Sequence, residues 1–122
     1  MIIQVYRGSS HAKEIVRDGF DVSKIGTGWG LTYGRGIYFT RDIREAQCYG
    51  PDILVCSIRY KPYTLCREYT PKRKQDTREL QALRDMAIEQ GYSCFENKSG
   101  SEIIVFDTKD IVSIDIHEAV YT

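Results

Sequence analysis

The stretch YGRGIYFTRDIREAQCY, residues 33–49, decides the fold that this sequence predicts. A glycine-rich turn comes first, and residues 36–40 then have the β-branched and aromatic content that is typical of a strand. Asp42, with a glutamate three positions later, resembles a capping box and predicts a helix over residues 42–49. We therefore expect a strand that passes directly into a short helix.

Two tyrosines, Tyr38 and Tyr49, stand in the strand and at the end of the helix of this stretch. Both side chains can pack in a core as ordinary aromatic residues. Alternatively, they hold a flat ring between them, because aromatic rings stack favourably in offset geometry. The pattern of the stretch by itself leaves both interpretations open.

Two loops and one long helix follow from the sequence around this stretch. Residues 19–34 hold five glycines and predict a long loop, of the kind that is often functional, and residues 61–75 predict a polar loop. We expect Asp76 or Thr77 to cap the long helix and Gly91 to end it. The further elements that we expect are strands at 2–6, 53–60, 102–107 and 111–116 and helices at 11–18 and 76–90.

The order of these elements predicts an α+β fold. Many short strands with a few helices, and no regular alternation of strand and helix, are typical of a mostly antiparallel sheet or two. A chain of 122 residues is expected to form one domain, residues 1–122.

Composition limits the classes of partner. The 17 basic and 17 acidic residues give zero net charge, which argues against a general electrostatic grip on nucleic acid or on an anionic membrane. No apolar run is long enough to span a membrane, and the first residues, MIIQVYRG, lack the features of a signal peptide. We expect a cytoplasmic protein without a membrane partner, or one that is delivered as an effector.

The cysteines and histidines do not predict a metal site. The four cysteines form no C-x-x-C pair, and the chain has two histidines. Reduced thiols are the expected state, although an even number of cysteines leaves disulfides possible.

Two more short motifs carry groups that suit a sugar or a phosphate. In YRGS, residues 6–9, Arg7 offers a planar fork of donors and Gly8 allows close approach of the backbone to a ligand. Glu102 stands at the mouth of an apolar strand, where a carboxylate can accept a bond from a sugar hydroxyl and stabilise positive charge on the ring. Each motif also fits a plain strand end or a loop-edge residue.

The three motifs together resemble the ADP-ribosyltransferase superfamily, specifically its poly(ADP-ribose) polymerase-like (diphtheria-toxin-like) branch. They are YRGS at 6–9, GRGIYFTRDIREAQCY at 34–49 and SEIIVFDTKDIVSI at 101–114, and they follow one another in family order. The middle motif is the most specific, since the family has G-x-G-[IL]-Y-F, a helix with alanine or serine, and a second tyrosine eleven residues after the first. The resemblance implies two mostly antiparallel β-sheets that form an NAD cleft, with a few flanking helices.

The resemblance also implies roles for individual residues, with NAD as the substrate and no metal. Gly8 would pair its backbone with the nicotinamide carboxamide, Tyr49 would stack on the nicotinamide ring and Tyr38 would close its other side. Glu102 would hold a ribose hydroxyl and stabilise the transition state. The implied catalytic residues are Glu102, Tyr38 and Arg7, and the implied NAD-binding residues are Arg7, Gly8, Ser9, Trp29, Tyr38, Ala46 and Tyr49.

Two positions depart from the family pattern, and a third bears on the acceptor. Arg7 replaces a histidine that holds the adenosine ribose, and we expect this arginine to substitute for it. Ala46 stands where many members of the family have a serine that bonds the carboxamide, which predicts a weaker grip on nicotinamide or compensation elsewhere. Gly100 stands where arginine-modifying toxins carry a second glutamate, so modification of arginine is disfavoured.

The resemblance predicts a toxin-like or effector-like mono-ADP-ribosyltransferase. Its expected partners are NAD, a protein or nucleic-acid acceptor, and an antitoxin or immunity protein. Two alternatives stay open, namely an NAD glycohydrolase with water as the acceptor, and an inactive module that binds NAD or ADP-ribose. This inference from the size and motifs of the chain rests on analogy with the family.

Overall fold

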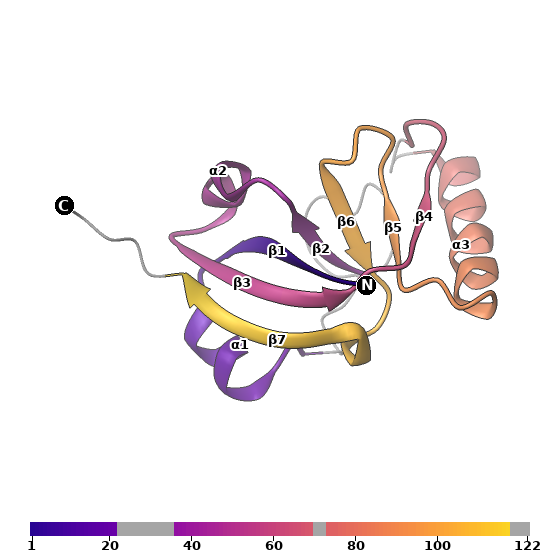
Figure 1. The fold of residues 1–122 in the computed structure, drawn as a ribbon. Coiled ribbons are helices and arrows are strands. Elements are labelled where there is room, and N and C mark those ends of the chain that lie inside the picture. The colour runs from indigo at the N-terminus through magenta and orange to yellow at the C-terminus, as the bar shows by residue number, and fades with distance from the viewer. Residues whose placement is uncertain (22–35, 70–72, 118–122) are drawn as a thin grey trace.

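A mixed β-sheet with helices on its faces forms the described part of the protein (Figure 1). Its structure is a computed structural model that describes residues 1–21, 36–69 and 73–117. Within these residues the sheet has seven strands in the order β4-β5-β6-β2-β1-β3-β7. The strands are β1 (Ile2–Ser9), β2 (Ile37–Thr40), β3 (Asp52–Arg59), β4 (Pro62–Thr64), β5 (Cys94–Glu96), β6 (Glu102–Val105) and β7 (Ile111–His117), and the helical elements are α1 (Ala12–Asp18), α2 (Ile43–Ala46), η2 (Gln47–Tyr49), α3 (Lys74–Glu89) and η3 (Thr108–Asp110).

The α+β class and the mostly antiparallel pairing are confirmed, but the expected division into two sheets is not found in the described residues. All neighbouring strands pair antiparallel except β4 and β5, which pair parallel. One described pair, Tyr6 with Thr40, joins β1 to β2. This pair connects strands β4, β5, β6 and β2 with strands β1, β3 and β7 in one sheet. The helical elements that the sequence predicts at 11–18 and 42–49 are present as α1 and as α2 with η2.

The first core cluster lies on the sheet face that α1 covers. Alternate residues of β1, β3 and β6 fill it, because successive strand residues point to opposite faces. Ala12 of α1 and the half-buried Phe20 pack against these side chains. The fully buried strand residues of this cluster are Val5, Leu54, Cys56, Ile58, Cys94, Ile103 and Val105.

The second core cluster lies on the opposite face and extends over only part of the sheet. Leu80 and Ala87 of α3 pack there against Phe95, Ile104 and Phe106. Phe95 and Ile104 lie in β5 and β6 and Phe106 directly follows β6, and Figure 1 shows α3 beside β4 at that end of the sheet. Helix α3 therefore does not cover the face of β1 that lies opposite α1. The candidate site lies on this face.

The long helix begins differently from the prediction. α3 begins at Lys74, and Arg73 precedes it without a side-chain cap, so the expected cap by Asp76 or Thr77 is wrong. Asp76 is buried and instead accepts a hydrogen bond of 3.0 Å from Arg67. The expected end is confirmed, since Gly91 follows the helix with φ +86°, a conformation that favours glycine.

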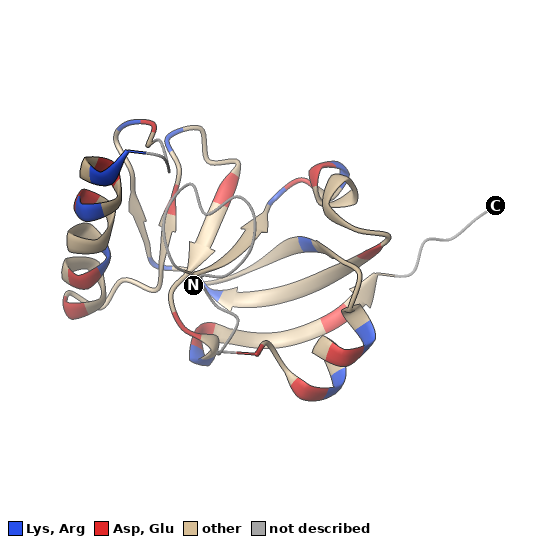
Figure 2. Ribbon diagram, turned by 180° about the vertical axis from the view of Figure 1, so that it is seen from behind, with Lys and Arg blue, Asp and Glu red and all other residues tan. Residues whose placement is uncertain are grey.

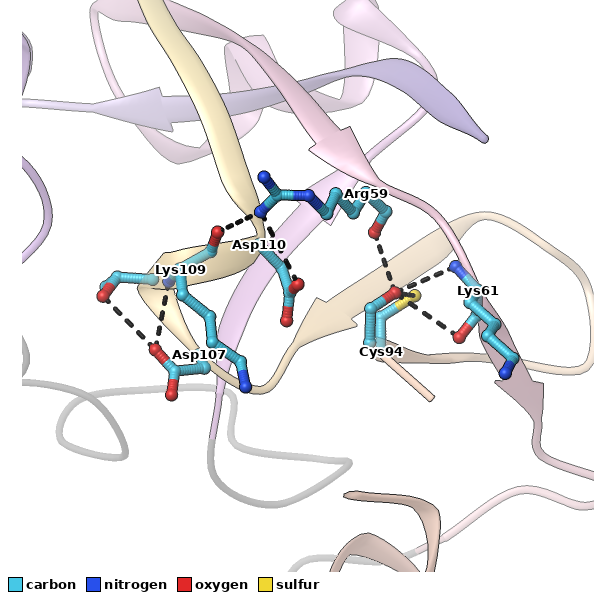
Figure 3. A network of polar contacts seen from close by, with 8 residues as sticks. Arg59, Lys61, Cys94, Asp107, Lys109 and Asp110 are labelled. Atoms are coloured by element: carbon cyan, nitrogen blue, oxygen red, sulfur yellow. Dashed lines mark hydrogen bonds and ion pairs between the residues drawn. The ribbon is translucent and has the colours of Figure 1, made fainter. Parts of the chain in front are cut away.

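Two short strands, β4 and β5, were not predicted, and β4 lies inside the predicted polar loop 61–75. A network of polar contacts supports them at the junction with β3 (Figure 3). The hydroxyl of Ser93 donates to the carbonyl of Arg59 at 2.8 Å and accepts from the Lys61 N–H at 2.9 Å. Three-residue strands have too little pattern of their own to be read from sequence, so pairing and these contacts define them.

Charge is spread over the described surface without one sign collecting on a single helix. Figure 2 shows basic and acidic residues interspersed along α1 and α3. Within the described residues, no helix has the length and apolar content needed to cross a membrane.

Candidate functional site

Strand β1 is paired unequally on its two sides, and the candidate site lies on the poorly paired side. Against β3 it pairs at all eight of its residues, from Ile2 to Ser9. Against β2, within the described residues, it pairs at Tyr6 and Thr40 alone. We call the region around this pair the β1–β2 junction; it consists of Tyr6, Arg7, Gly8, Tyr38 and Thr40.

Glycines bring β1 into direct backbone contact with the helix that follows β2. A Cβ atom on Gly8 would lie 2.0 Å from the carbonyl oxygen of Ala46 in α2. A Cβ atom on Gly50, just after η2, would lie 2.5 Å from the backbone nitrogen of Ser9. Only glycine permits this approach, so these two positions seat α2 and η2 on β1.

The register of the strands places four side chains on the same sheet face. Thr40 pairs with both Tyr6 and Glu102, and side chains of paired residues share a face. Tyr38, two residues before Thr40, lies on this face as well and packs against the second core cluster. Gly8 also belongs to it by alternation from Tyr6, so α2 and η2 cover the same face.

A tight turn holds the catalytic candidate Glu102 at the start of β6. Asn97 is buried, and its side-chain oxygen accepts from the backbone N–H of Glu102 at 2.9 Å. The backbone N–H of Asn97 donates to the Glu102 carbonyl at 3.1 Å. Gly100 turns the chain between them with φ +76°. Burial raises the pKa of the half-buried Glu102 carboxyl, and the nearby carboxylates of Glu45 and Glu68 raise it further.

The two tyrosines of the central stretch have different environments. Tyr49 at the end of η2 is 72% exposed, so the interpretation that both tyrosines pack in a core is wrong for this one. Tyr38 is half-buried at the margin of the second cluster. Ala46, the alanine at the family's serine position, is fully buried against β1.

Arg7 and Ser9 lie on the other face of the sheet, because they alternate with Gly8. The Arg7 guanidinium carbon is 5.9 Å from the centre of the Phe20 ring, which belongs to the first core cluster. Its Nη1 donates to the carbonyl oxygen of Tyr38 at 2.9 Å, across the β1–β2 junction. Burial lowers the pKa of Arg7. The structure thus brings Arg7 to the backbone of Tyr38 and not to Glu102.

Neither Ser9 nor Trp29 is among the described residues of this face. Ser9 is buried and its hydroxyl accepts from the His11 N–H at 2.9 Å, just before α1. Trp29 and most of the predicted loop 19–34 lie outside the described residues. Gly36 has no room for a side chain, because a Cβ atom would lie 2.4 Å from Ile104.

Sequence reasoning missed two residues of this face, Thr40 and Glu45. Asp42 does cap α2, since its carboxylate accepts from the Arg44 N–H at 2.9 Å. The reciprocal half of the expected capping box is wrong, because the Asp42 N–H donates to the Thr40 hydroxyl and Glu45 also bonds that hydroxyl. The alternation of Tyr38 with Thr40 was the signal that placed Thr40 on this face.

The cysteines form two kinds of thiol. Cys48 and Cys66 are exposed, whereas Cys56 and Cys94 are buried, and all four are free. Burial raises the pKa of Cys56 to about 12 and that of Cys94 to about 11. Within the described residues, no three metal-binding side chains gather at one place.

Comparison with known proteins informs the fold and not the chemistry. No family model matches the chain, and no curated protein matches it. The chain is similar to a solved structure described as "Crystal structure of an anti-CRISPR protein", with a TM-score of 0.52 and 13% identity over 96% of each chain. At this identity the likeness shows a shared fold alone.

Proposed function

We propose that this protein is an NAD-dependent mono-ADP-ribosyltransferase that cleaves the nicotinamide–ribose bond and transfers ADP-ribose to a macromolecular acceptor. One observation carries the proposal. Five residues from five separate elements belong to one face of the sheet at the β1–β2 junction or to the helical turns that cover it, namely Gly8, Tyr38, Ala46, Tyr49 and Glu102. These are five of the positions that the family resemblance implies.

In the proposed reaction, the nicotinamide ring lies between Tyr38 and Tyr49, and Glu102 accepts a hydrogen bond from a ribose hydroxyl. The bond between the ribose anomeric carbon and the nicotinamide nitrogen breaks, and its electron pair leaves with nicotinamide. The positive charge that remains on the ribose is stabilised by the Glu102 carboxylate. The acceptor nucleophile then bonds to the anomeric carbon and releases its proton to solvent.

Arg7 takes a supporting part in this proposal. Its bond to the Tyr38 carbonyl holds the main chain of β2 where β1 no longer pairs with it. Its direct contact with NAD, which the family resemblance implies, stays a prediction, as does the contribution of Ser9 and Trp29.

The test is nicotinamide release from NAD by the purified protein, beside Glu102→Gln and the exposed control Glu14→Gln on α1. We expect the wild type and the control to release nicotinamide, the Glu102 variant to lose release, and cell lysate to accelerate it. Release that no lysate accelerates would favour the glycohydrolase. NAD binding without release, detected as a rise in melting temperature, would favour the inactive binding module.

The acceptor is to be found with labelled NAD. Toxin-like and effector-like activity, and an antitoxin or immunity partner, remain predictions from the resemblance. The solved neighbour's description as an anti-CRISPR protein makes CRISPR effector proteins a first class of acceptor to test beside whole lysate. Label on a protein band that depends on Glu102 would identify the acceptor.

A further inference from the structure

A buried hydroxyl, that of Thr40, occupies the middle of the candidate site, and the proposed reaction does not use it. Thr40 is 6% exposed. Its hydroxyl donates to Oε2 of Glu45 at 3.0 Å and accepts from the Asp42 N–H at 3.1 Å. Because the hydroxyl has a donor and an acceptor partner at once, its orientation is defined.

These contacts hold the Glu45 carboxylate beside Glu102. Thr40 and Glu102 are directly paired on neighbouring strands, so their side chains are neighbours on one face. Glu45 reaches Thr40 from α2, and the residue itself is exposed. The charge on Glu45 disfavours ionisation of Glu102, and Glu68 acts in the same direction.

Neither carboxylate is neutralised by a cation of the described chain. Asp42, Glu79 and Glu96 form ion pairs with Arg44, Arg67 and Arg41. No ion pair within residues 1–21, 36–69 and 73–117 involves Glu45 or Glu102. Two negative charges close together are unfavourable in the free protein and become favourable when a positive charge forms next to them.

We propose that Glu45 is a second functional carboxylate of this site and that Thr40 is its positioning residue, so that two negative charges meet the cationic ribose formed when nicotinamide leaves. This inference rests on the proposed function. It assigns a role to two residues to which the family resemblance gives none, although both lie within the motif at 34–49.

The test compares NAD cleavage as a function of pH in the wild type and in Glu45→Gln. Glutamine keeps an oxygen that accepts from Thr40 and removes the charge. We expect kcat to fall at least about tenfold, with KM for NAD within about threefold. Activity needs ionised Glu102 and is lost as pH falls through its pKa. Loss of the Glu45 charge lowers that pKa, so the acid limb of the profile moves to lower pH.

Variants of the positioning residue separate this role from a general loss of structure. Thr40→Val removes the hydroxyl with little change of shape, and we expect it to shift the acid limb in the same direction. Thr40→Ser keeps the hydroxyl and is expected to restore the wild-type profile. Glu14→Gln on α1 is the matched control and leaves the profile unchanged. An unshifted acid limb and unchanged kcat in Glu45→Gln would overturn the inference.

A second measurement keeps the inference separate from the proposed function. If the wild type releases no nicotinamide at any pH, the proposed function fails. Carbon NMR titration of the Glu102 carboxyl in the full chain then tests the charge placement directly. A lower midpoint in Glu45→Gln, but not in Glu14→Gln, supports the placement, and an unchanged midpoint overturns it.

Discussion

The two sides of β1 differ in how far they pair with their neighbours within the described residues. On the β3 side, eight residues pair in continuous register, and the central pair of Val5 with Cys56 is fully buried. On the β2 side, one described pair joins the strands. Beyond this pair, the Arg7 side chain donates to the backbone carbonyl of Tyr38 in β2. The same strand thus serves as a structural element on one side and as the border of the candidate site on the other.

This difference indicates how a small domain can carry the candidate site without losing its core. The first core cluster continues beneath both sides of β1, on the face that α1 covers. The opposite face has α3 at one end and α2 with η2 near Gly8. Between them lie Tyr6, Thr40 and Glu102, whose polar groups would be costly to bury in a continuous apolar layer.

The largest expected effect comes from closing the contact of β1 with α2. Gly8→Ala would place a methyl group 2.0 Å from the Ala46 carbonyl, and α2 must then move away from β1. We expect a loss of about 3 kcal/mol in the free energy of unfolding, measured by urea denaturation. Ser10→Ala, which is exposed, is the control and should change this free energy by less than about 0.5 kcal/mol. Equal stability of the two variants would contradict the close contact.

The next effect tests the bond across the β1–β2 junction. Arg7→Leu removes the donor to the Tyr38 carbonyl and should cost about 1–2 kcal/mol, because a backbone acceptor loses its partner. Hydrogen exchange should increase in β2 while the amides of β3 keep their protection. A uniform increase over both strands would mean that Arg7 supports the whole sheet and not this junction.

Thiol chemistry offers a third contrast between the two sides. Cys56, paired with Val5 on the β3 side, should resist a thiol reagent in the folded protein, whereas Cys48 in η2 should react. Burial raises the pKa of Cys56 from 9.0 to about 12. The unfolded thiol ionises first as pH rises, so this stabilising contribution is present below pH 9.0 and is lost progressively up to about 12.

The number of thiols that react with the reagent, and unfolding curves at several pH values, check this prediction. Cys56→Ala is unsuitable as a control because it creates a cavity. Cys48→Ser is suitable, since it removes an exposed thiol and should lower the number of fast-reacting groups by one. Rapid reaction of all four thiols in the folded chain would contradict the buried positions of Cys56 and Cys94.

The smallest effect on stability is expected at the exposed tyrosine. Tyr49→Ala removes a side chain that is 72% exposed and should change the free energy of unfolding by less than about 0.5 kcal/mol. The same variant should weaken NAD binding, because the proposed stacking platform is lost. Isothermal titration with NAD measures this, with Tyr49→Phe as the variant that keeps the ring. Unchanged affinity in Tyr49→Ala would remove Tyr49 from the proposed site.

Much of the local structure follows from the sequence, and the exceptions have physical causes. The strand before Asp42 and the cap of α2 were predicted because their signals lie within a few neighbouring residues. The start of α3 was not, since Asp76 is used by Arg67 from a different segment. Strands β4 and β5 were missed because three residues are too few to show a period.

The candidate site divides in the same way. Alternation along a strand is a property of the chain itself, so Tyr38 and Thr40 of the predicted strand 36–40 had to share a face. The first strand was predicted to end at residue 6 but extends to Ser9, so the opposite faces of Arg7 and Gly8 were not predicted. The sequence by itself therefore determined how side chains alternate within the strands that it predicts. For Gly8, the sequence indicated only that a residue without a side chain allows close approach of the backbone, and not that α2 is the element that approaches.

Only the tertiary structure decided which strands became neighbours and how far they stayed together. The pairing of Thr40 with Tyr6 and Glu102, and the end of β1–β2 pairing after one described residue pair, join segments far apart in the chain. Such registers depend on burial across the whole sheet, which no local propensity encodes. The contact of Glu45 with Thr40 beside Glu102 exists for the same reason, because it needs β2, α2 and β6 to be packed together.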